Sequence, residues 1–348
     1  MQQLNQELLA LTRPYIGRTD LVQGPGGNTS VKGEKGEMMI KASGFRFEEM
    51  NSLLGFSVVN YQNIRQYFNT VKITNKDTQE RKSVDFILNN ILNDLDGSLY
   101  PRPSMETGFH AVLDKYVVHT HSVWTNLVNC QSESESLLNK IREELNIPIA
   151  SIPYTSPGFG LSYLISKVVL ESNKNKRACP KIFFLANHGI IGHSHEAQEV
   201  HDLLNKVDQT IIRLLQVESQ YPGTNLQEEK FQNYIPIDDF VNRQICDYKV
   251  DIEFFKQVLF PDQTVFFKDN ISFEAPDSNK KIRIDKEGRI AYFTGYREAK
   301  SIHETMTAYF FIYNNILKSG KGIKLIPEYE QDYIHGMDME KHRKSLME

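Results

Sequence analysis

The sequence predicts an α/β protein in which helices cover a mixed or antiparallel sheet, followed by a smaller α+β module. Segments with the two-residue period of strands alternate with segments of helical period. Strands follow one another across short turns as often as across helices, which favours antiparallel pairing over a purely parallel sheet. A chain of 348 residues is long enough for roughly two domains or one enlarged domain.

Composition limits the class of protein and its partners. Hydrophobic residues make up 40% of the chain and charged residues 24%, which is ordinary for a soluble globular protein. The net charge of −4 argues against nucleic acid or an anionic membrane surface as a partner. No segment has the roughly 20 apolar residues of a membrane span, and the first residues lack the order of a signal peptide. The three cysteines are widely spaced and form no disulfide framework, so we expect a cytoplasmic protein.

The first 225 residues carry the clearest periodicity. Leu4, Leu8 and Leu11 recur at helical spacing, and Ser104 has the chemistry of a helix N-cap. Runs of β-branched residues bounded by glycine or charged turns indicate strands. We expect helices over residues 4–17, 61–71, 83–92, 104–113, 132–145, 160–170 and 197–217, and strands on both sides of the glycine turn within 20–32 and over 38–43, 58–60, 116–124 and 181–185.

The pattern weakens over residues 218–250, where polar and turn-forming residues gather, and we place a domain boundary there. The first domain is expected to span residues 1–225, and a C-terminal α+β module residues 250–348. Within this module two short apolar runs flank Lys286-Glu-Gly288, which is a hairpin pattern, and a helix is expected over 298–317. The sequence alone assigns the module no role.

The most informative motif is His119-Thr-His121, in the valine-containing run 116–124. Alternate side chains of a strand point to the same face, so both imidazoles should face one side and chelate one cation. Glu106 and His188 lie beside apolar or glycine-rich segments whose ends could converge on the same pocket. Three histidines with a carboxylate or water are the ligand set of a catalytic zinc site, although another divalent metal fits the same donors.

Several histidines also allow simpler interpretations. A single histidine among apolar residues is more often a hydrogen-bonded core residue than a ligand, and this alternative applies to His188 taken alone. His110 follows Glu106 by four residues on the same helix face, where it either orients the carboxylate or packs, and packing is favoured. His193 and His195 fall in a polar turn, where solvation explains them.

Two loops, residues 24–30 and 41–44, are candidates for anion binding. Their glycines let backbone N–H groups approach an anion, and neighbouring hydroxyl and amide groups add neutral donors. The helix expected after Ser104 would add its dipole. The pattern is neither a P-loop nor a dinucleotide fingerprint, so we expect no nucleotide cofactor, and two ordinary hairpin turns remain the alternative. The candidate donors are Asn28, Thr29, Ser43, Gly44 and Ser104.

Five segments taken together resemble the class II aldolase/adducin family. They occur in the family's order over about the first 220 residues. No single segment is decisive, but all five in this order make a match that is specific to the family. Within the family, the chain is most similar to the aldolase half of bifunctional rhamnulose-phosphate aldolase/alcohol dehydrogenase proteins. This similarity is carried by the segment 21–32, the C-terminal module and the tail 326–344. The five segments are Gly26-Gly-Asn-Thr-Ser30, Ala42-Ser-Gly44, Pro103-Ser-Met-Glu106, Val118-His-Thr-His121 and Asn187-His-Gly189.

The resemblance implies both a fold and an activity. The fold is a three-layer α/β/α sandwich with a central, mainly antiparallel sheet, assembled as a homo-oligomer and commonly as a tetramer. The activity is that of a zinc-dependent lyase, which cleaves or forms a C–C bond in a ketose phosphate through a metal-stabilised enediolate. By position, the resemblance assigns His119, His121 and His188 to zinc, Glu106 to acid–base catalysis, and Asn28, Ser43, Gly44 and Ser104 to the substrate phosphate.

The chain departs from the family pattern in ways that leave alternatives open. Many family aldolases carry Ser-Ser before the glutamate, whereas this chain has Ser104-Met105 and so lacks one phosphate-binding hydroxyl. Lys41 could compensate with its charge, and the donor need then not be dihydroxyacetone phosphate. The catalytic tyrosine of fuculose-phosphate aldolase has no clear counterpart; Tyr154 is a candidate, although packing is favoured there. Epimerisation or dehydration at the same metal, and a non-catalytic adducin-like domain, are the alternative functions.

Overall fold

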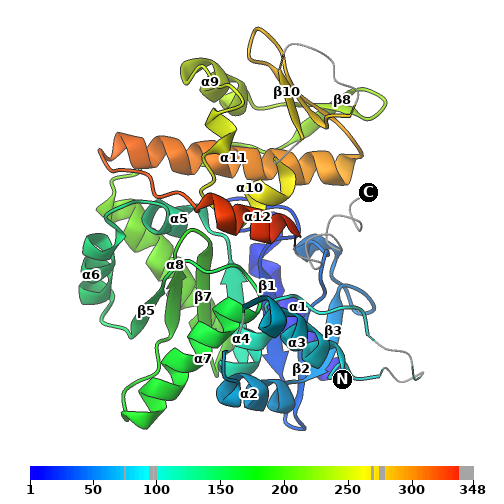
Figure 1. Cartoon of the computed structure of the whole chain (residues 1–348), viewed down its shortest axis with the longest axis vertical. Helices are drawn as coiled ribbons and strands as arrows, with labels where there is room; N and C mark the ends of the chain where they lie inside the picture. The colour runs from blue at the N-terminus through cyan, green and yellow to red at the C-terminus, as the bar shows by residue number, and fades with distance from the viewer. Residues whose placement is uncertain (74–75, 94–96, 98–99, 268–269, 274–278, 337–348) are drawn as a thin grey trace.

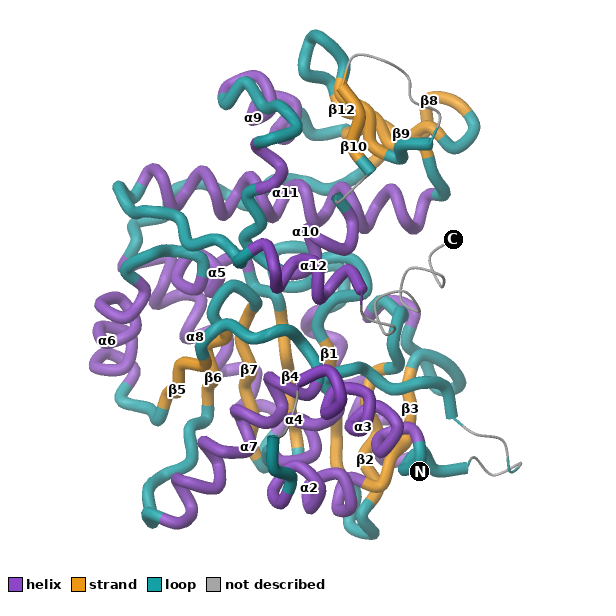
Figure 2. Tube along the Cα trace, in the orientation of Figure 1, coloured by secondary structure: helices purple, strands orange, loops and turns teal. Residues whose placement is uncertain are grey.

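The computed structural model describes residues 1–73, 76–93, 97, 100–267, 270–273 and 279–336. Within these ranges the protein has a seven-stranded sheet covered by helices and a C-terminal module built on a five-stranded sheet (Figure 1 and Figure 2). The part of the tail between residues 339 and 344, included in the resemblance to bifunctional aldolases, lies outside the described residues. None of the helices in the described ranges combines the length and apolar character needed to cross a bilayer.

The first sheet confirms the predicted central, mainly antiparallel arrangement. Its strands lie in the spatial order β3-β2-β1-β4-β7-β6-β5. Neighbours are antiparallel except for β5 and β6, which pair in parallel. The strands are β1 (Asn28–Lys32), β2 (Glu37–Lys41), β3 (Phe56–Asn60), β4 (Tyr116–Thr120), β5 (Ile149–Ile152), β6 (Ile182–Leu185) and β7 (Gly189–Ser194).

Adjacent residues of the central strands enter different cores, so helices cover both faces of the sheet. On β4, Val117 packs with one helical layer and Val118 with the other. The structure therefore confirms the three-layer α/β/α sandwich. One layer contains α2 (Tyr61–Thr70), α3 (Lys76–Leu88), α4 (Thr107–Val112) and α7 (Phe159–Lys174), and the other contains α1 (Gln2–Thr12), α5 (Val123–Asn129), α6 (Ser134–Leu145) and α8 (Ala197–Leu214).

Two segments expected as strands differ in the structure. The run 116–124 ends as a strand at Thr120, because the hydroxyl of Ser122 accepts a hydrogen bond from the Thr125 backbone and caps α5. The strand expected before the glycine turn is absent, since the N–H groups of Leu21 and Val22 both donate to the carbonyl of Arg18 in a turn. Short 3-10 turns occur at 13–15, 47–49 and 254–256.

The C-terminal module contains the predicted hairpin, formed by β11 (Ile282–Ile284) and β12 (Ile290–Phe293). The sheet order is β10-β11-β12-β9-β8, so β8 and β9 join the module although they fall within the stretch of weak sequence pattern. The remaining elements are β8 (Leu226–Lys230), β9 (Asn233–Pro236), β10 (Ile271–Phe273), α9 (Phe240–Asp247), α10 (Pro261–Phe266), α11 (Tyr296–Lys318) and α12 (Glu328–Gly336).

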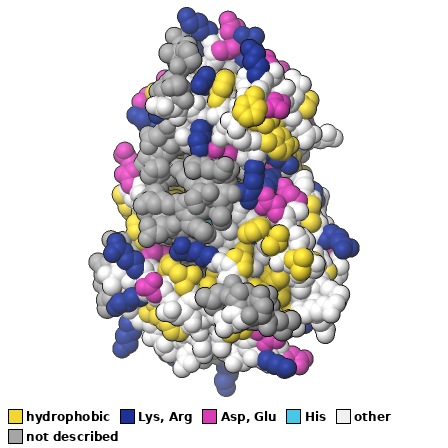
Figure 3. Space-filling model, turned by 90° about the vertical axis from the view of Figure 1, so that its right-hand side faces the viewer, with side chains coloured by type: hydrophobic (Ala, Val, Ile, Leu, Met, Phe, Trp, Pro, Cys, Tyr) yellow, Lys and Arg dark blue, Asp and Glu magenta, His cyan; other side chains and the backbone are white. Residues whose placement is uncertain are grey.

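Helix α11 joins the two parts of the molecule. It runs between the first domain and the five-stranded sheet, and α10 and α12 lie on its side that faces the first domain (Figure 1 and Figure 2). Its buried residues share one apolar core with Val123, Leu127 and Cys130 of the first domain. On the face drawn in Figure 3, acidic and basic side chains are interspersed over the described residues, in keeping with the small net charge.

Candidate metal centre

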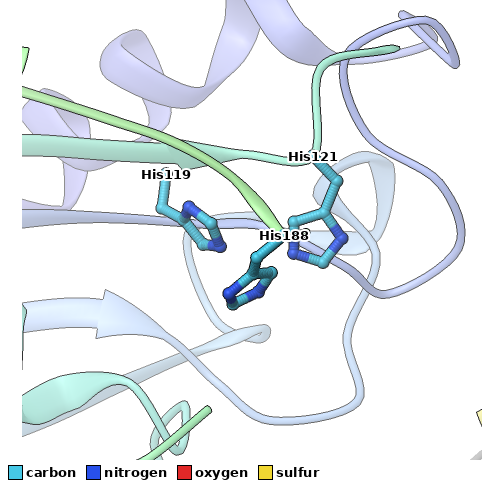
Figure 4. Close-up of side chains that lie close together, drawn as sticks. All are labelled: His119, His121 and His188. Atoms are coloured by element: carbon cyan, nitrogen blue, oxygen red, sulfur yellow. The ribbon is translucent and has the colours of Figure 1, made fainter. Parts of the chain in front are cut away.

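One strand end and one turn bring three histidines together. His119 is on β4, His121 follows the end of that strand, and His188 lies in the turn between β6 and β7. In the register of β4 with β7, Thr120 is opposite Ile190, so the turn that carries His188 reaches the end of β4. The three ring centroids are 4.9 to 5.0 Å apart. One nitrogen from each ring lies within 4.8 Å of the other two (Figure 4).

Glu106 faces these rings from the loop before α4. Its Oε2 lies 3.4 Å from His119 Nε2, and its Oε1 lies 3.6 Å from His188 Nε2. Glu106 is 4% exposed, and among the described residues neither its Oε1 nor His119 Nε2 has a hydrogen-bond partner. Unpaired burial of such atoms is costly, and a cation bound between them would satisfy both. Three imidazoles and a carboxylate therefore fit a divalent metal such as zinc.

A backbone contact orients the ring of His119, and a second contact holds the turn that carries His188. His119 Nδ1–H donates to the carbonyl of Ile190 at 3.0 Å, and because a carbonyl oxygen only accepts, the Nε2 lone pair faces the cluster. Burial lowers the pKa of His119 below its ordinary value, which favours the neutral ring that a metal requires. Asn126 Nδ2 donates to the carbonyl of His188 at 3.2 Å and so holds the turn in place.

Glycines occur where the loops close on these ligands. Gly27 has φ of +60°, and a β-carbon there would lie 2.8 Å from the carbonyl oxygen of His119. A β-carbon at Gly189 would collide with the carbonyl of Thr120. Gly27 and Gly189 are therefore required because their backbones lie close against the backbone at the end of β4.

A hydrogen-bonded chain behind Glu106 fixes its carboxylate. Asn28 Nδ2 donates to Glu106 Oε2 at 2.7 Å and to the Ser104 hydroxyl at 3.0 Å. His110 Nε2–H donates to Asn28 Oδ1, and its Nδ1 lies 2.7 Å from the Ser30 hydroxyl. Although helical spacing favours simple packing for His110, the structure places it where it orients the amide that holds Glu106. Burial lowers the pKa of His110 well below its usual value, which favours the neutral ring.

Most of the predicted site residues line one open cavity of about 500 Å³. The glycine loop, the end of β2 and the candidate metal-binding residues all line it, and the glycine loop lies close to His121, because a β-carbon at Gly26 would be 2.9 Å from His121 Nδ1. The predicted residues on its surface are Asn28, Ser43, Gly44, Ser104, Glu106, His121 and His188, and the unassigned ones include Lys41, Met105, Pro157, Pro261 and Asp262.

Thr29 is not brought to this cavity. It follows Asn28 on β1 and points to the opposite face, where its hydroxyl lies 2.7 Å from that of Thr12. Lys41 does reach the cavity wall, and its ammonium donates to the carbonyls of Pro25 at 2.9 Å and Phe45 at 2.7 Å. The positive charge next to Ser43 is therefore held by backbone oxygens of both loops.

Asp262 was not predicted from the sequence, although it contacts the ring of His121, a candidate metal ligand. Its Oδ2 lies 2.6 Å from His121 Nδ1, across a sequence separation of 141 residues. No local pattern marks it, because it sits at the start of an ordinary short helix after Pro261. Only the fold brings this carboxylate to the site.

The other residues considered from sequence lie elsewhere. Tyr154 packs against the core of the C-terminal module, and its hydroxyl is buried rather than directed to the surface. Burial raises the pKa of this phenol. His193 is also buried rather than solvated, since it lies on β7 with Nε2 2.7 Å from the carbonyl of Pro180. His195 is exposed, as expected.

The sequence matches a family model, described as Class II Aldolase and Adducin N-terminal domain, over residues 6–211. The match covers more than half of the chain and includes all three histidines and Glu106. The chain belongs to this family. The class II aldolase domain thus extends to α8 and stops before β8, and the module with Asp262 lies outside it. No curated protein sequence matches the chain.

Several solved structures are similar to this class II aldolase family member. The N-terminal Class II Aldolase domain of a conserved protein from Thermoplasma acidophilum is 24% identical, with 60% of this chain and 92% of that chain covered and a TM-score of 0.48. A sugar-phosphate aldolase from Thermotoga maritima is 16% identical, with coverages of 63% and 98% and a TM-score of 0.42. An L-fuculose 1-phosphate aldolase is 16% identical, with coverages of 63% and 89% and a TM-score of 0.40.

Proposed function

We propose that this protein is a zinc-dependent aldolase that cleaves or forms a C–C bond in a ketose phosphate. The observation that carries the proposal is the pair of buried atoms, His119 Nε2 and Glu106 Oε1, which have no hydrogen-bond partner among the described residues and face the same space as His188. A scaffold domain would have no need for such a costly arrangement.

The part of the cavity wall that contains Lys41, Ser43, Gly44 and Ser104 suits the phosphate of the substrate. Ser43 and Ser104 offer hydroxyl donors, Gly44 offers a backbone N–H, and the buried Lys41 brings positive charge to the same wall. Asn28 lies between this wall and Glu106. A ketose phosphate bound across the cavity would thus present its carbonyl to the metal ligands and its anionic end to the glycine loops.

The chain's residues divide the reaction between them. When bound, a divalent ion supplies Lewis acidity that polarises the ketose carbonyl. In the cleavage direction Glu106 accepts the proton of the C4 hydroxyl as the C3–C4 bond breaks and the C4 carbonyl forms, and it then delivers that proton to C3. Asn28 holds the Glu106 carboxylate in position through Oε2, so that Oε1 remains directed into the site.

Two further proposals concern the reaction type and the subfamily of this protein. Epimerisation or dehydration of a sugar phosphate is the alternative chemistry, because Glu106 beside a metal serves proton transfer in either reaction. The phrase 21–32 together with the module supports a relationship to the aldolase half of bifunctional rhamnulose-phosphate aldolase/alcohol dehydrogenase proteins. We further propose a cytoplasmic homo-oligomer, for which light scattering of the purified protein would give the number of subunits.

The decisive experiment is a retro-aldol screen of the purified protein, stripped of metal and then reloaded with zinc. A panel of ketose 1-phosphates and their unphosphorylated ketoses is offered, and released dihydroxyacetone phosphate or dihydroxyacetone is measured by enzymatic reduction. We expect zinc-dependent cleavage of at least one phosphorylated ketose. The stripped protein is the matched control for metal dependence.

Three results distinguish the functions. Zinc-dependent release of the three-carbon ketone supports the aldolase. Isomer formation or water loss without cleavage, followed by NMR, would replace it with the epimerase or dehydratase. Failure of the folded protein to bind zinc or any other divalent metal ion would contradict all metal-dependent functions and favour the adducin-like interaction domain.

A further inference from the structure

The C-terminal module contacts three of the loops that form the cavity. Asn187, which precedes a metal-binding histidine, donates from Nδ2 to the carbonyl of Leu259 at 2.9 Å. Glu304 accepts a hydrogen bond from the Gly24 N–H at 2.7 Å. Arg297 donates to the carbonyl of Gly44 at 2.7 Å. These contacts tie the histidine turn and both glycine loops to residues outside the class II aldolase domain.

The most direct of the module's contacts is made by Asp262. Its Oδ2 accepts a hydrogen bond from His121 Nδ1–H at 2.6 Å, and both side chains are nearly inaccessible, with 2% and 6% exposure. Because a carboxylate is an acceptor, this contact keeps the hydrogen on Nδ1 and leaves Nε2 as the metal-binding atom. Figure 4 shows one nitrogen of His121 directed toward the other two rings and the other directed away from them.

The carboxylate is held rigidly at the start of α10. Gln263 Oε1 accepts hydrogen bonds from the backbone N–H groups of Leu259 and Phe260, at 2.6 and 3.3 Å, which fixes the entry into the helix. Phe260 and Phe266 are buried in the core shared with α11. A supporting group held in this way sets the direction of a ligand more accurately than one on a mobile loop.

A purely structural ion pair is the competing interpretation. It would require a doubly protonated ring at His121, whose Nε2–H would point at His119 and His188 and could not bind a cation. The arrangement of three rings with one nitrogen each toward a common point is instead what a ligand oriented by a carboxylate produces.

We propose that Asp262 is a positioning residue of the metal centre, so that the C-terminal module completes a site whose ligands all belong to the first domain. The inference rests on the metal dependence in the proposed function. It assigns the module a role that its sequence does not reveal, namely to orient His121 and to hold the loops around it.

The test uses the full chain and two readouts that do not depend on turnover. Zinc affinity is measured by competition with a chromophoric chelator in wild type, Asp262→Asn, Asp262→Ala and the control Asp239→Asn, which removes an exposed carboxylate of the same module. The tautomer of His121 is measured in metal-free, ¹⁵N-histidine-labelled protein by long-range ¹H–¹⁵N NMR, with its signals assigned by their absence from His121→Gln.

We expect Asp262→Ala to weaken zinc binding by about 10- to 100-fold, Asp262→Asn to weaken it less because the amide oxygen still accepts, and Asp239→Asn to leave it unchanged. The fraction of His121 with hydrogen on Nδ1 should fall in Asp262→Ala. If Asp262→Ala does not fold, as judged by circular dichroism, the Asp262→Asn variant decides by the same two readouts.

Unchanged zinc affinity in the folded Asp262→Ala variant, or an unchanged His121 tautomer, would overturn the role of Asp262 while leaving the proposed aldolase intact. Wild-type protein that binds neither zinc nor another divalent metal ion would instead overturn the metal-dependent function itself. Wild-type protein that binds zinc but cleaves no ketose, with affinity lost in Asp262→Ala, would sustain the positioning role and reject the aldolase.

Discussion

The first domain and the C-terminal module contribute different kinds of group to the same cavity. The first domain supplies the proposed metal ligands and acid–base group, such as His188 and Glu106, which line the cavity. The module supplies groups that hold those atoms or their loops, such as Glu304 and Arg297. Substitutions in the first domain should therefore change chemistry, whereas those in the module should change placement and stability.

The largest effect on turnover should come from His188→Ala. Loss of one of three ligands should weaken zinc binding by more than about 100-fold, beyond what loss of a supporting partner costs, and turnover should disappear with the metal. Zinc content after dialysis, measured by atomic absorption, checks this. The control is His195→Ala, which removes an exposed imidazole. A dialysed His188→Ala protein with one zinc per chain would contradict the ligand assignment.

Glu106→Gln separates the acid–base group from the metal ligands. The amide keeps the shape and the hydrogen bonding near Asn28 but cannot transfer the proton, so kcat should fall by about 10²- to 10⁴-fold. Zinc content should stay at the wild-type level. Steady-state kinetics with atomic absorption on the same sample test both statements. Loss of zinc in this variant would show that Glu106 acts mainly as a ligand.

Ser104→Ala tests the proposed phosphate-binding part of the cavity. Loss of a hydroxyl donor to a charged phosphate should raise KM for the phosphorylated ketose by about 10- to 100-fold, with zinc affinity unchanged. Kinetics with matched phosphorylated and unphosphorylated ketoses measure the effect, and Ser172→Ala, on α7, serves as the control. A fall in kcat at constant KM would mean that Ser104 acts through Asn28 rather than on the anion.

Glu304→Gln tests the module with a smaller effect on turnover. Both carboxylate oxygens of Glu304 accept from Arg46, at 2.7 and 2.8 Å, in a nearly fully buried pair. Glu48, 2.6 Å from Arg46 Nε, is then the remaining counter-charge of the buried guanidinium. Loss of the Glu304 charge should therefore lower the free energy of unfolding by about 3 kcal/mol, the lower end for a broken buried pair, measured by urea denaturation. Replacing both residues with methionine should recover much of this loss. Unchanged stability in the single variant would mean that the pair does not fasten the module.

The smallest effect on turnover is expected from substitution of two buried groups, His303 and Asp208. Their contributions to the free energy of unfolding depend on pH in opposite directions. Burial lowers the pKa of His303 in the module to about 4, below its unfolded value, so its contribution to stability is lost as pH falls from about 6.5 to 4. Burial raises the pKa of Asp208 in the first domain to about 7, so stability is lost as pH rises from about 4 to 7.

These two slopes should partly cancel in wild type. Urea denaturation between pH 4 and 7.5 should show stability falling with rising pH in His303→Gln, and falling with acidification in Asp208→Asn, each by a few kcal/mol. If wild type and both variants show the same dependence of unfolding free energy on pH, this difference between the first domain and the C-terminal module is contradicted.

The sequence predicted the elements whose pattern is local. The central sheet, the long helices at α8 and α11, and the β11–β12 hairpin follow from apolar periodicity. The His-x-His spacing placed two histidines on the same side, and the convergence of Glu106 and His188 on them followed from motif order. Asn28 and Ser104 were likewise expected at the cavity, and the structure puts them there.

The remaining features depend on contacts that no local pattern encodes. Thr29 was predicted to bind substrate together with Asn28. Successive residues of a strand face opposite sides of the sheet, so Thr29 points away from the cavity that Asn28 lines. The strand through Trp124 ended early because Ser122 caps a helix. Asp262 and Glu304 reach the site only because α10 and α11 pack against the first domain. Packing between distant segments decides such positions.

The shared core of α11 has a consequence for biosynthesis. Val123, Leu127 and Cys130 are made long before the helices that cover them, because α10 and α11 leave the ribosome after the whole seven-stranded sheet. Until those helices arrive, an apolar surface of the nascent chain faces water, and the imidazole after β4 lacks its carboxylate. A fragment cut after residue 225 would inherit both defects, so we expect it to be recovered as aggregate rather than as an independent enzyme.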